Sequence, residues 1–239
     1  MDNFNREKLL IGENNFNKLK NSHIIVFGLG GVGGYAVEML ARLGIGNIDI
    51  VDGDVVSNTN LNRQIIALEN TIGKYKTDLF EERIKLINKD CNVKKYTLFY
   101  DDDTKDLIDL NKYDYVIDAI DTVKAKLDII SYCINNKINI ISSMGMGNRI
   151  DPSLVKITDI SKTEYDPLSK IIRKKLREKN INHLKVVYSS ERPIEIKYDS
   201  NSEKKGNNYA PGSISLVPSV AGIMLASEVF NSILKEIDI

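Results

Sequence analysis

Cysteine is scarce in this chain of 239 residues. Its two cysteines, Cys91 and Cys133, lie far apart, and there is no CxxC pair. Disulfide frameworks and four-cysteine zinc sites need more cysteines at paired spacings. The sequence therefore excludes both kinds of site. Cys91 follows a helical pattern and Cys133 lies within one, so we expect both to be packing residues.

The chain also lacks an excess of charge of either sign. Lysine and arginine number 33, aspartate and glutamate number 33, and the formal net charge is zero. The chain therefore has no overall positive charge that would favour binding to nucleic acid or to a membrane. Local basic patches can still bind either. The first 22 residues are polar and charged, so we expect no signal peptide and a cytoplasmic location.

Long uninterrupted apolar runs are missing as well. The most apolar stretch, residues 213–234, contains Pro218 and Glu228. These interruptions argue against a transmembrane helix. We expect no integral membrane segment, and a helix over about 219–235 that packs on a sheet or in a dimer interface.

Strand and helix patterns alternate through the first two-thirds of the chain, without an internal repeat. Alternation with almost continuously apolar strands predicts a parallel sheet covered by helices on both faces. We therefore predict an α/β fold with a Rossmann-like, mostly parallel sheet. Strands are expected at 23–28, 47–52, 93–99, 113–119 and 138–143, and helices at 32–43, 76–88, 103–110 and 123–136.

The pattern changes near Gly145. A loop leads to an edge-type strand, and Asp166-Pro167 predicts the start of a helix that runs to about Lys179. Strands are expected at 185–189 and 194–198, followed by a long loop at 199–213. We predict one domain over 1–239, with a nucleotide-binding core at 1–150. Residues 151–239 are expected to form a C-terminal antiparallel extension over the ligand face, for substrate and dimer contacts.

A glycine-rich turn follows the first strand and opens the next helix. Gly28, Gly30 and Gly33 fit the pattern G-x-G-x-x-G, which lets backbone N–H groups approach phosphate at a helix N-terminus. Asp52 ends the second strand, where a carboxylate accepts hydrogen bonds from ribose hydroxyls. This context predicts nucleotide binding and leaves the nucleotide unspecified.

Polar side chains are concentrated just after the second strand, in "GDVVSNTNLNRQIIALENTIGKYKTD" at 53–78. Arginine and lysine here are suited to hold phosphates and offset charge during attack on an α-phosphate. On spacing alone, two interpretations stay open: a phosphate site, or a polar capping loop followed by a solvated lysine. The candidates for a phosphate site are Asn60, Arg63, Gln64 and Lys76.

Two carboxylates end a later strand, in "YVIDAIDTVKAK" at 115–126. One of Asp118 and Asp121 is a candidate ligand for Mg²⁺, which prefers oxygen ligands and binds together with phosphates. Taken alone, Asp121 is equally consistent with the N-cap of the following helix. The nearby glycine loop and basic residues favour the metal role.

Four motifs occur together: "GLGGVGGYAVEMLARLGIG", "DGDVVSNTNLNRQ", "IGKYK" and "DAID". In this order they resemble the ubiquitin-activating-like adenylyltransferase superfamily, of the ThiF, MoeB and HesA type, over nearly the whole chain. The resemblance implies binding of ATP and Mg²⁺ and adenylation of a carboxylate. It implies a backbone cradle at Gly28, Gly30, Gly31 and Gly33, ribose contact by Asp52, a phosphate set of Asp54, Asn60, Arg63, Gln64 and Lys76, and a metal position at Asp121.

Further segments resemble the tRNA threonylcarbamoyladenosine dehydratase branch, among them "REKLLIGENNFNKLKNS" and "RIDPSLVKITDISKTEYDPLSKIIRKKLR". This implies activation of the threonyl carboxylate of a modified adenosine beside the anticodon. Attack by the neighbouring carbamoyl group then closes a ring with net loss of water. Proximity strongly favours such an intramolecular step.

The same resemblance suggests partners. In related dimers an arginine near the N-terminus reaches ATP in the partner subunit, and Arg6 matches that position, which implies a homodimer. The basic cluster "RKKLREK" at 173–179 is the best candidate surface for tRNA, or else a solvated helix face. A sulfur-transfer partner of the cysteine desulfurase type is a further possible partner that the sequence leaves open.

Three alternatives are weaker. A protein that activates the C-terminus of a small ubiquitin-like sulfur carrier often has two CxxC zinc pairs and a crossover-loop cysteine, and residues 190–218 contain no cysteine. An NAD-dependent oxidoreductase has no general need for Arg63, Lys76 and Asp121 at the phosphate end. A non-catalytic nucleotide sensor is disfavoured because the ATP-handling set is complete.

Overall fold

A seven-stranded sheet forms the centre of the computed structural model, which describes residues 3–197, 204–205 and 208–234. The strand order is β3-β2-β1-β4-β5-β7-β6. All neighbours pair in parallel except β6 and β7, which are antiparallel at one edge. The predicted mostly parallel fold is confirmed. The strands are β1 His23–Phe27, β2 Asn47–Val51, β3 Asn92–Tyr96, β4 Tyr115–Asp118, β5 Ile140–Ser143, β6 Val155–Asp159 and β7 Lys185–Ser189.

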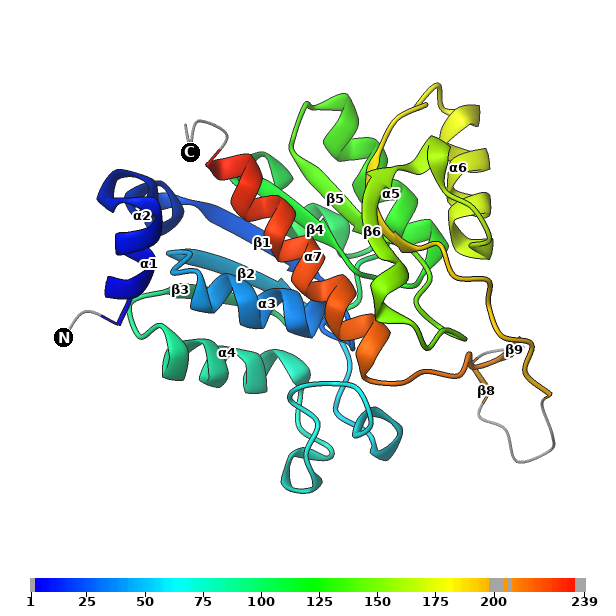
Figure 1. The fold of residues 1–239 in the computed structure, drawn as a ribbon, viewed down its shortest axis with the longest axis horizontal. Coiled ribbons are helices and arrows are strands. Elements are labelled where there is room, and N and C mark those ends of the chain that lie inside the picture. The colour runs from blue at the N-terminus through cyan, green and yellow to red at the C-terminus, as the bar shows by residue number, and fades with distance from the viewer. Residues whose placement is uncertain (1–2, 198–203, 206–207, 235–239) are drawn as a thin grey trace.

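Helices cover both faces of this sheet (Figure 1). One apolar cluster joins α2, α3, α4 and α7 to one face, and a second joins α5 and α6 to the other. Successive residues of β1 alternate between the clusters: Ile24 and Val26 face the first, Ile25 and Phe27 the second. The helices are α1 Asn5–Ile11, α2 Glu13–Asn21, α3 Gly33–Arg42, α4 Lys76–Ile87, α5 Val123–Asn135, α6 Pro167–Glu178 and α7 Leu216–Ile233.

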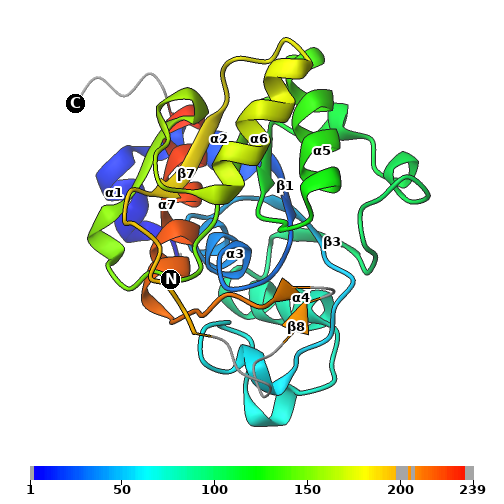
Figure 2. The same cartoon turned by 90° about the vertical axis from the view of Figure 1, so that its right-hand side faces the viewer.

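The sheet order reverses between β1 and β4. The crossover from β1 leads to β2 on one side, and the chain returns to place β4 on the other side of β1. Parallel sheets bind ligands outside the carboxyl ends of the strands at such a switch point. Figure 2 views the edge of the sheet where these carboxyl ends lie.

The start of α6 follows its predicted capping signal. The Asp166 side chain accepts a hydrogen bond from the Ser169 N–H at 2.8 Å, and Pro167 occupies the first helical turn. Ile172 and Leu176, four residues apart, are fully buried on the helix face that packs on the sheet.

Helix α7 is long and apolar enough to cross a membrane by length and composition alone. Its apolar residues have partners within the described structure, because Val217, Leu225 and Val229 are fully buried in the first cluster. A Cβ at Gly222 would lie 2.3 Å from the Val32 carbonyl oxygen, so α7 approaches α3 very closely. The predicted packing on the sheet is confirmed. Pro218 does not interrupt the helix, because it lies in the first turn, where its missing N–H has no helical partner.

The helix predicted at 103–110 is wrong. Only short 3₁₀ turns form there, at Lys105–Leu107 and Leu110–Lys112. The Asp101 side chain accepts hydrogen bonds from the backbone N–H groups of Asp103 and Thr104, and such local bonds compete with helix formation.

The strand predicted at 194–198 is also absent from its described part, Ile194 to Lys197; Tyr198 lies outside the described residues. The Ile194 N–H instead donates to the Asn148 carbonyl oxygen. The predicted loop at 199–213 contains a small hairpin, β8 Lys204–Lys205 with β9 Asn208–Tyr209, and its other residues before 208 lie outside the described residues. Helices α1 and α2 were not predicted.

Candidate nucleotide site at the carboxyl edge of the sheet

The glycine loop makes contacts that only glycine permits. Gly28 has φ +85°, and a Cβ there would lie 2.7 Å from the Ala119 carbonyl oxygen at the end of β4. A Cβ at Gly33 would lie 1.8 Å from the Gly28 carbonyl oxygen. No side chain caps the start of α3. The loop is therefore tight, and the first N–H groups of α3 are suited to meet an anion.

The next two glycines lie against residues of the 53–78 segment. A Cβ at Gly31 would lie 3.3 Å from Arg63 Cγ, and one at Gly30 would lie 3.9 Å from Gln64 Nε2. The Gln64 side chain is buried, and its Oε1 has no hydrogen-bond partner in the described structure. Buried polar atoms are normally paired, so this amide beside the loop fits a site that receives a polar ligand.

Asp52 is held rigidly at the end of β2. Its Oδ2 accepts the Leu29 N–H at 2.7 Å and its Oδ1 accepts the Asp54 N–H at 2.8 Å. Burial raises the pKa of Asp52, and this outweighs the opposing effect of Lys76. Each carboxylate oxygen has a second acceptor position. Asp52 is therefore suited to the predicted contact with ribose hydroxyls.

Lys76 is the first residue of α4 and its side chain is only 5% exposed. Its Nζ lies 2.8 Å from Asp54 Oδ2 and 3.7 Å from Asp52 Oδ1. The alternative of a solvated first-turn lysine is therefore wrong. The structure brings Lys76 to the same carboxyl edge as the glycine loop, next to both carboxylates.

Two of the predicted polar residues are also part of local turns. Asn60 is buried, and its Oδ1 accepts the Ser57 N–H at 3.1 Å, which closes a 3₁₀ turn. Arg63 donates from Nη1 to the Thr59 carbonyl oxygen at 2.6 Å and to Asn62 Oδ1 at 3.0 Å. The polar loop thus caps its own 3₁₀ turn and not α4, whose N-cap is Tyr75 without a side-chain hydrogen bond. Arg63 packs beside Gly31 at the same time.

The two carboxylates after β4 have different environments. Asp118 is fully buried; its Oδ2 lies 2.7 Å from Lys126 Nζ and accepts the Ser142 hydroxyl at 2.6 Å. This ion pair removes Asp118 from the candidate metal ligands. Asp121 is exposed in the loop before α5, whose N-cap is Thr122. The N-cap interpretation of Asp121 is therefore wrong, while its metal role remains a prediction.

Comparison with known proteins shows the family of this chain. A sequence profile described as the ThiF family matches residues 4–239, which is almost the whole chain. The chain belongs to the ThiF family.

Several relatives carry one enzyme name. The chain is 43% identical to "tRNA threonylcarbamoyladenosine dehydratase" of Bacillus subtilis, over 99% of this chain and 96% of the relative. It is also similar to crystal structures of Escherichia coli tRNA N6-threonylcarbamoyladenosine dehydratase, TcdA. The complex with AMP has a TM-score of 0.88 at 34% identity, and the complex with ATP has 0.85 at 33% identity. Each covers 98% of this chain and 94% of the other chain.

Arg6 does not belong to the site within a single chain of this ThiF-family protein. It is exposed on α1, which packs at the far end of α3 from the glycine loop (Figure 1). At that far end, a Cβ at Gly44 would lie 2.7 Å from the ring of Phe16 and 3.4 Å from Phe4. Ten residues of α3 separate the two ends, which is about 15 Å. Participation of Arg6 therefore requires a second copy, and it remains a prediction.

Both cysteines are packing residues, as predicted. Cys91 and Cys133 are fully buried in the two apolar clusters. Burial raises the pKa of Cys91 to about 11 and that of Cys133 to about 12. Since the thiolate is the nucleophile, neither thiol is suited to covalent catalysis near neutral pH.

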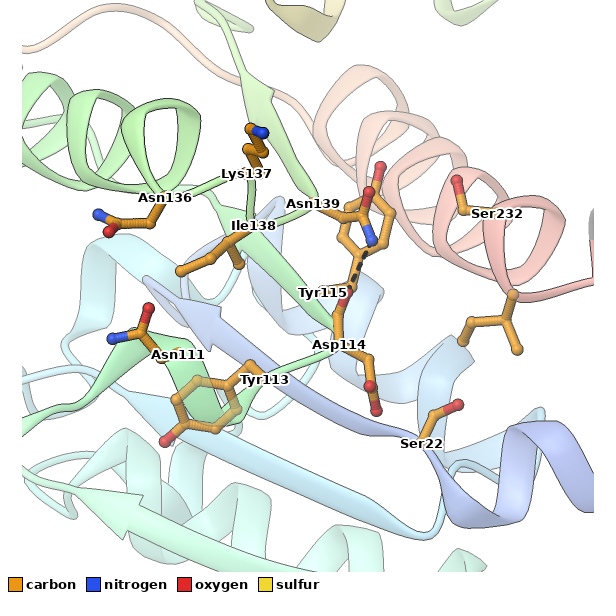
Figure 3. A pocket seen from close by; sticks show the side chains of 11 residues that line it. Ser22, Asn111, Tyr113, Asp114, Tyr115, Asn136, Lys137, Ile138, Asn139 and Ser232 are labelled. Atoms are coloured by element: carbon orange, nitrogen blue, oxygen red, sulfur yellow. Dashed lines mark hydrogen bonds between the residues drawn. The ribbon is translucent and has the colours of Figure 1, made fainter.

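A hollow of about 500 Å³ lies at the opposite, amino-terminal edge of the sheet. Figure 3 shows its polar lining, in which Asn139 donates to the Asp114 carbonyl oxygen at 3.1 Å. The hollow is large enough to admit a small molecule. It lacks the glycine loop, the buried lysine and the helix N-terminus found at the carboxyl edge, so the chemistry favours the carboxyl edge.

Sequence reasoning missed a buried arginine beyond β5. Arg149 is 3% exposed and donates to the carbonyl oxygens of Gly145, Gly147 and Glu191 at 2.6, 3.2 and 3.2 Å. Its guanidinium also lies 3.6 Å from Asp166 Oδ2. Arg149 therefore ties three chain segments together at the carboxyl edge, and no local sequence pattern marks it.

A second missed feature is a pair of exposed side chains beside that arginine. Tyr165 has φ +55°, a left-handed conformation that costs a non-glycine residue roughly 1–2 kcal/mol. The Arg192 guanidinium carbon lies 4.5 Å from the centre of the Tyr165 ring, and Arg192 Nη2 donates to the Tyr165 hydroxyl at 3.3 Å.

Proposed function

We propose that the chain is an ATP-dependent tRNA threonylcarbamoyladenosine dehydratase. The threonyl carboxylate of the modified adenosine attacks the α-phosphate of ATP, forming an acyl adenylate and releasing pyrophosphate. The neighbouring carbamoyl group then attacks the activated carbonyl carbon and AMP leaves, so the nucleoside loses one water overall. A carboxylate is a poor electrophile, and adenylation gives it a good leaving group.

The observation that carries this proposal is the convergence of Lys76, Arg63 and Gln64 on the glycine loop. A cradle of N–H groups at a switch point binds any phosphate. The Arg63 side chain packs against Gly31. Lys76 Nζ lies 3.7 Å from Asp52, which accepts the loop N–H of Leu29. Two cations in these positions suit a triphosphate whose charge must be offset when the α-phosphate is attacked. The relatives described above, which match this chain over 94% or more of both lengths, carry the dehydratase name.

Each residue has a proposed role. The backbone around Gly28, Gly30, Gly31 and Gly33 holds phosphate oxygens, and Asp52 accepts from the ribose hydroxyls. Lys76 lies between two carboxylates and is positioned to transfer its hydrogen bonds to phosphate oxygens. Asp54, Asn60, Arg63 and Gln64 complete the triphosphate surroundings.

Mg²⁺ fits this site only together with the nucleotide. The described residues contain no group of three side chains that could hold a metal alone. Mg²⁺ commonly uses one or two carboxylates plus phosphate oxygens, and Asp121 is an exposed carboxylate in the loop next to the glycine turn. When bound, the ion would offset triphosphate charge, while Asp121 would hold it.

The tRNA surface is proposed to include one face of α6. Lys170, Lys174, Lys175 and Arg177 are exposed, whereas Arg173 donates to the carbonyl oxygens of Ile160 and Thr163. Arg173 therefore stabilises a loop, and the other four carry the proposed phosphate contacts. Binding through such contacts falls steeply with salt, with a slope of about −0.7 to −0.9 per contact on a logarithmic plot.

We also propose a homodimer in the cytoplasm. Leu9 and Leu10 are 79% and 85% exposed on α1, beside Arg6, and a second copy would cover them. This would also bring Arg6 near a partner's nucleotide. A sulfur-transfer partner stays a prediction with no structural support.

The test is direct. The protein is incubated with ATP, Mg²⁺ and tRNA bearing threonylcarbamoyladenosine, and the nucleosides are analysed by mass spectrometry. Loss of the mass of one water, dependent on ATP, is the expected result. An unchanged nucleoside, with pyrophosphate exchange that depends on a small carrier protein, would reject the dehydratase in favour of a carrier-activating adenylyltransferase.

A further inference from the structure

Tyr165 and Arg192 come from distant parts of the chain and meet at the carboxyl edge of the sheet. Tyr165 immediately precedes the Asp166 cap of α6, and Arg192 follows the end of β7 by three residues. Asp166 accepts the N–H of Gly145, just beyond β5, at 2.9 Å, which places Tyr165 at the same edge. The two side chains therefore lie on the side of the molecule that carries the nucleotide site.

The backbone beneath this pair is firmly held. The buried Arg149 guanidinium donates to the Glu191 carbonyl oxygen and lies 3.6 Å from Asp166 Oδ2. One buried arginine thus contacts the chain neighbour of Tyr165 and the chain neighbour of Arg192. Such anchoring fixes where both exposed side chains emerge.

The pair itself is accessible. Tyr165 is 49% exposed and Arg192 is exposed, with the guanidinium 4.5 Å from the ring centre. A weak surface contact of this kind is a poor explanation for the left-handed backbone at Tyr165. Unfavourable backbone conformations that the surroundings enforce are concentrated at ligand sites.

Arg192 of this pair follows β7, which lies three strands along the sheet from β1, where the glycine loop begins. Strands β1, β4, β5 and β7 are successive neighbours, and neighbouring strands lie about 4.8 Å apart. The end of β7 is therefore roughly 14 Å from the end of β1 and roughly 10 Å from that of β4. This spacing puts the pair at the same edge as the glycine loop but several strands away from it, where a second substrate has room beside the nucleotide.

We propose that Tyr165 and Arg192 form a stacking platform for a nucleobase of the RNA substrate next to the modified adenosine. Single-stranded RNA bases stack on aromatic rings and on guanidinium planes, and the positive charge of Arg192 also favours the RNA backbone. The platform rests on the proposed function, because it assumes an RNA substrate. It assigns substrate positioning to two residues outside the predicted nucleotide set.

The experiment compares anticodon stem–loop RNAs that carry threonylcarbamoyladenosine. One RNA is intact, and two others have an abasic nucleotide on the 5′ or the 3′ side of the modified adenosine. Dehydration is measured with the wild-type protein, Arg192→Ala, Arg192→Lys, Tyr165→Phe and Tyr165→Asn. Asparagine tolerates positive φ, so Tyr165→Asn removes the ring without adding backbone strain.

On intact RNA, Arg192→Ala and Tyr165→Asn are expected to raise the RNA KM about tenfold, with little change in the ATP KM. Tyr165→Phe should behave like wild type, and Arg192→Lys should recover only part of the loss because lysine lacks the plane. On one of the two abasic RNAs, the effect of Arg192→Ala and Tyr165→Asn should shrink to less than about twofold. The control Arg177→Ala removes an equal charge from α6 and should act equally on all three RNAs.

Equal losses for the platform variants on intact and both abasic RNAs, or no loss on intact RNA, would overturn the platform. If the wild-type protein dehydrates none of the RNAs, the proposed function fails instead. The platform is then judged by fluorescence anisotropy of the same labelled stem–loops. A base-dependent loss of affinity in Arg192→Ala would support it, and its absence would reject it.

Discussion

Replacement of Lys126 by methionine tests the buried ion pair beneath the candidate site. Lys126 and Asp118 have fully buried side chains, with Nζ and Oδ2 2.7 Å apart. Lys126 also donates to Ser142 Oγ at 3.0 Å and to the Ser143 carbonyl oxygen at 2.9 Å. Methionine preserves most of the apolar length and removes all three hydrogen bonds.

The expected cost follows from what remains behind. Asp118 keeps the Ser142 hydroxyl and the Ile120 N–H as donors, but loses its only observed cationic partner in the described structure. Breaking a buried pair by removing one partner costs about 3–5 kcal/mol. For a chain of this size, this corresponds to a fall in Tm of roughly 6–20 °C. A domain stable by about 10 kcal/mol, the middle of the usual range, would keep about 5–7 kcal/mol, so Lys126→Met should still fold.

Urea unfolding followed by circular dichroism measures this cost. The matched control is Lys124→Met, two residues away on α5, where the lysine is exposed and pairs with Asp102 at the surface; little change is expected. The double variant Asp118→Asn/Lys126→Met should be more stable than Lys126→Met alone, because no unpaired buried charge remains. A loss below about 1 kcal/mol in Lys126→Met, or a double variant less stable than the single one, would refute the reasoning.

Three further predictions concern the site and the amino-terminal helix. Lys76→Ala should abolish ATP-dependent turnover while the fold is kept; near-normal turnover would exclude its phosphate role. Arg6→Ala and Asp121→Asn homodimers should both be inactive, and mixing them should restore activity if Arg6 acts across the dimer; no recovery despite confirmed mixing would contradict this. Burial raises the pKa of Glu7 from 4.5 to about 7, so folding favours its protonated form. Its stabilising contribution is present below about pH 4.5 and is lost as the pH rises through 7. Glu7→Gln should flatten this dependence in urea midpoints and be more stable than wild type above pH 7; parallel pH profiles would contradict the assignment.

The parts of the fold that local sequence determines were predictable. The apolar strands, the glycine turn and the Asp166-Pro167 cap all form within a few residues of chain. The helix at 103–110 was wrong because a single side chain, Asp101, competes for the backbone N–H groups that would start it. Composition and periodicity carry no information about that competition.

The candidate site divides in the same way. Asp52 and Lys76 follow from strand ends and helix starts, so their place at the carboxyl edge was predictable. The pairing of Asp118 with Lys126 and Ser142 was not, because it depends on the register of β4 against β5, where Asp118 lies opposite Ser142. Tyr165 and Arg192 are 27 positions apart and contact each other directly. Their meeting depends on the buried Arg149, which contacts the chain neighbour of each.

Gly28 illustrates which structural requirements the local glycine motif explains and which it does not. The motif explains why a glycine follows β1, but not why this position has no room for a Cβ. The atom that excludes one is the carbonyl oxygen of Ala119, 2.7 Å away at the end of β4. Strand β4 lies there because β1 and β4 pair in register, with Phe27 opposite Asp118. The requirement for glycine at 28 thus comes from a strand about ninety residues later. A mutation that shifts the end of β4 should therefore disturb the glycine loop without altering any residue of that loop.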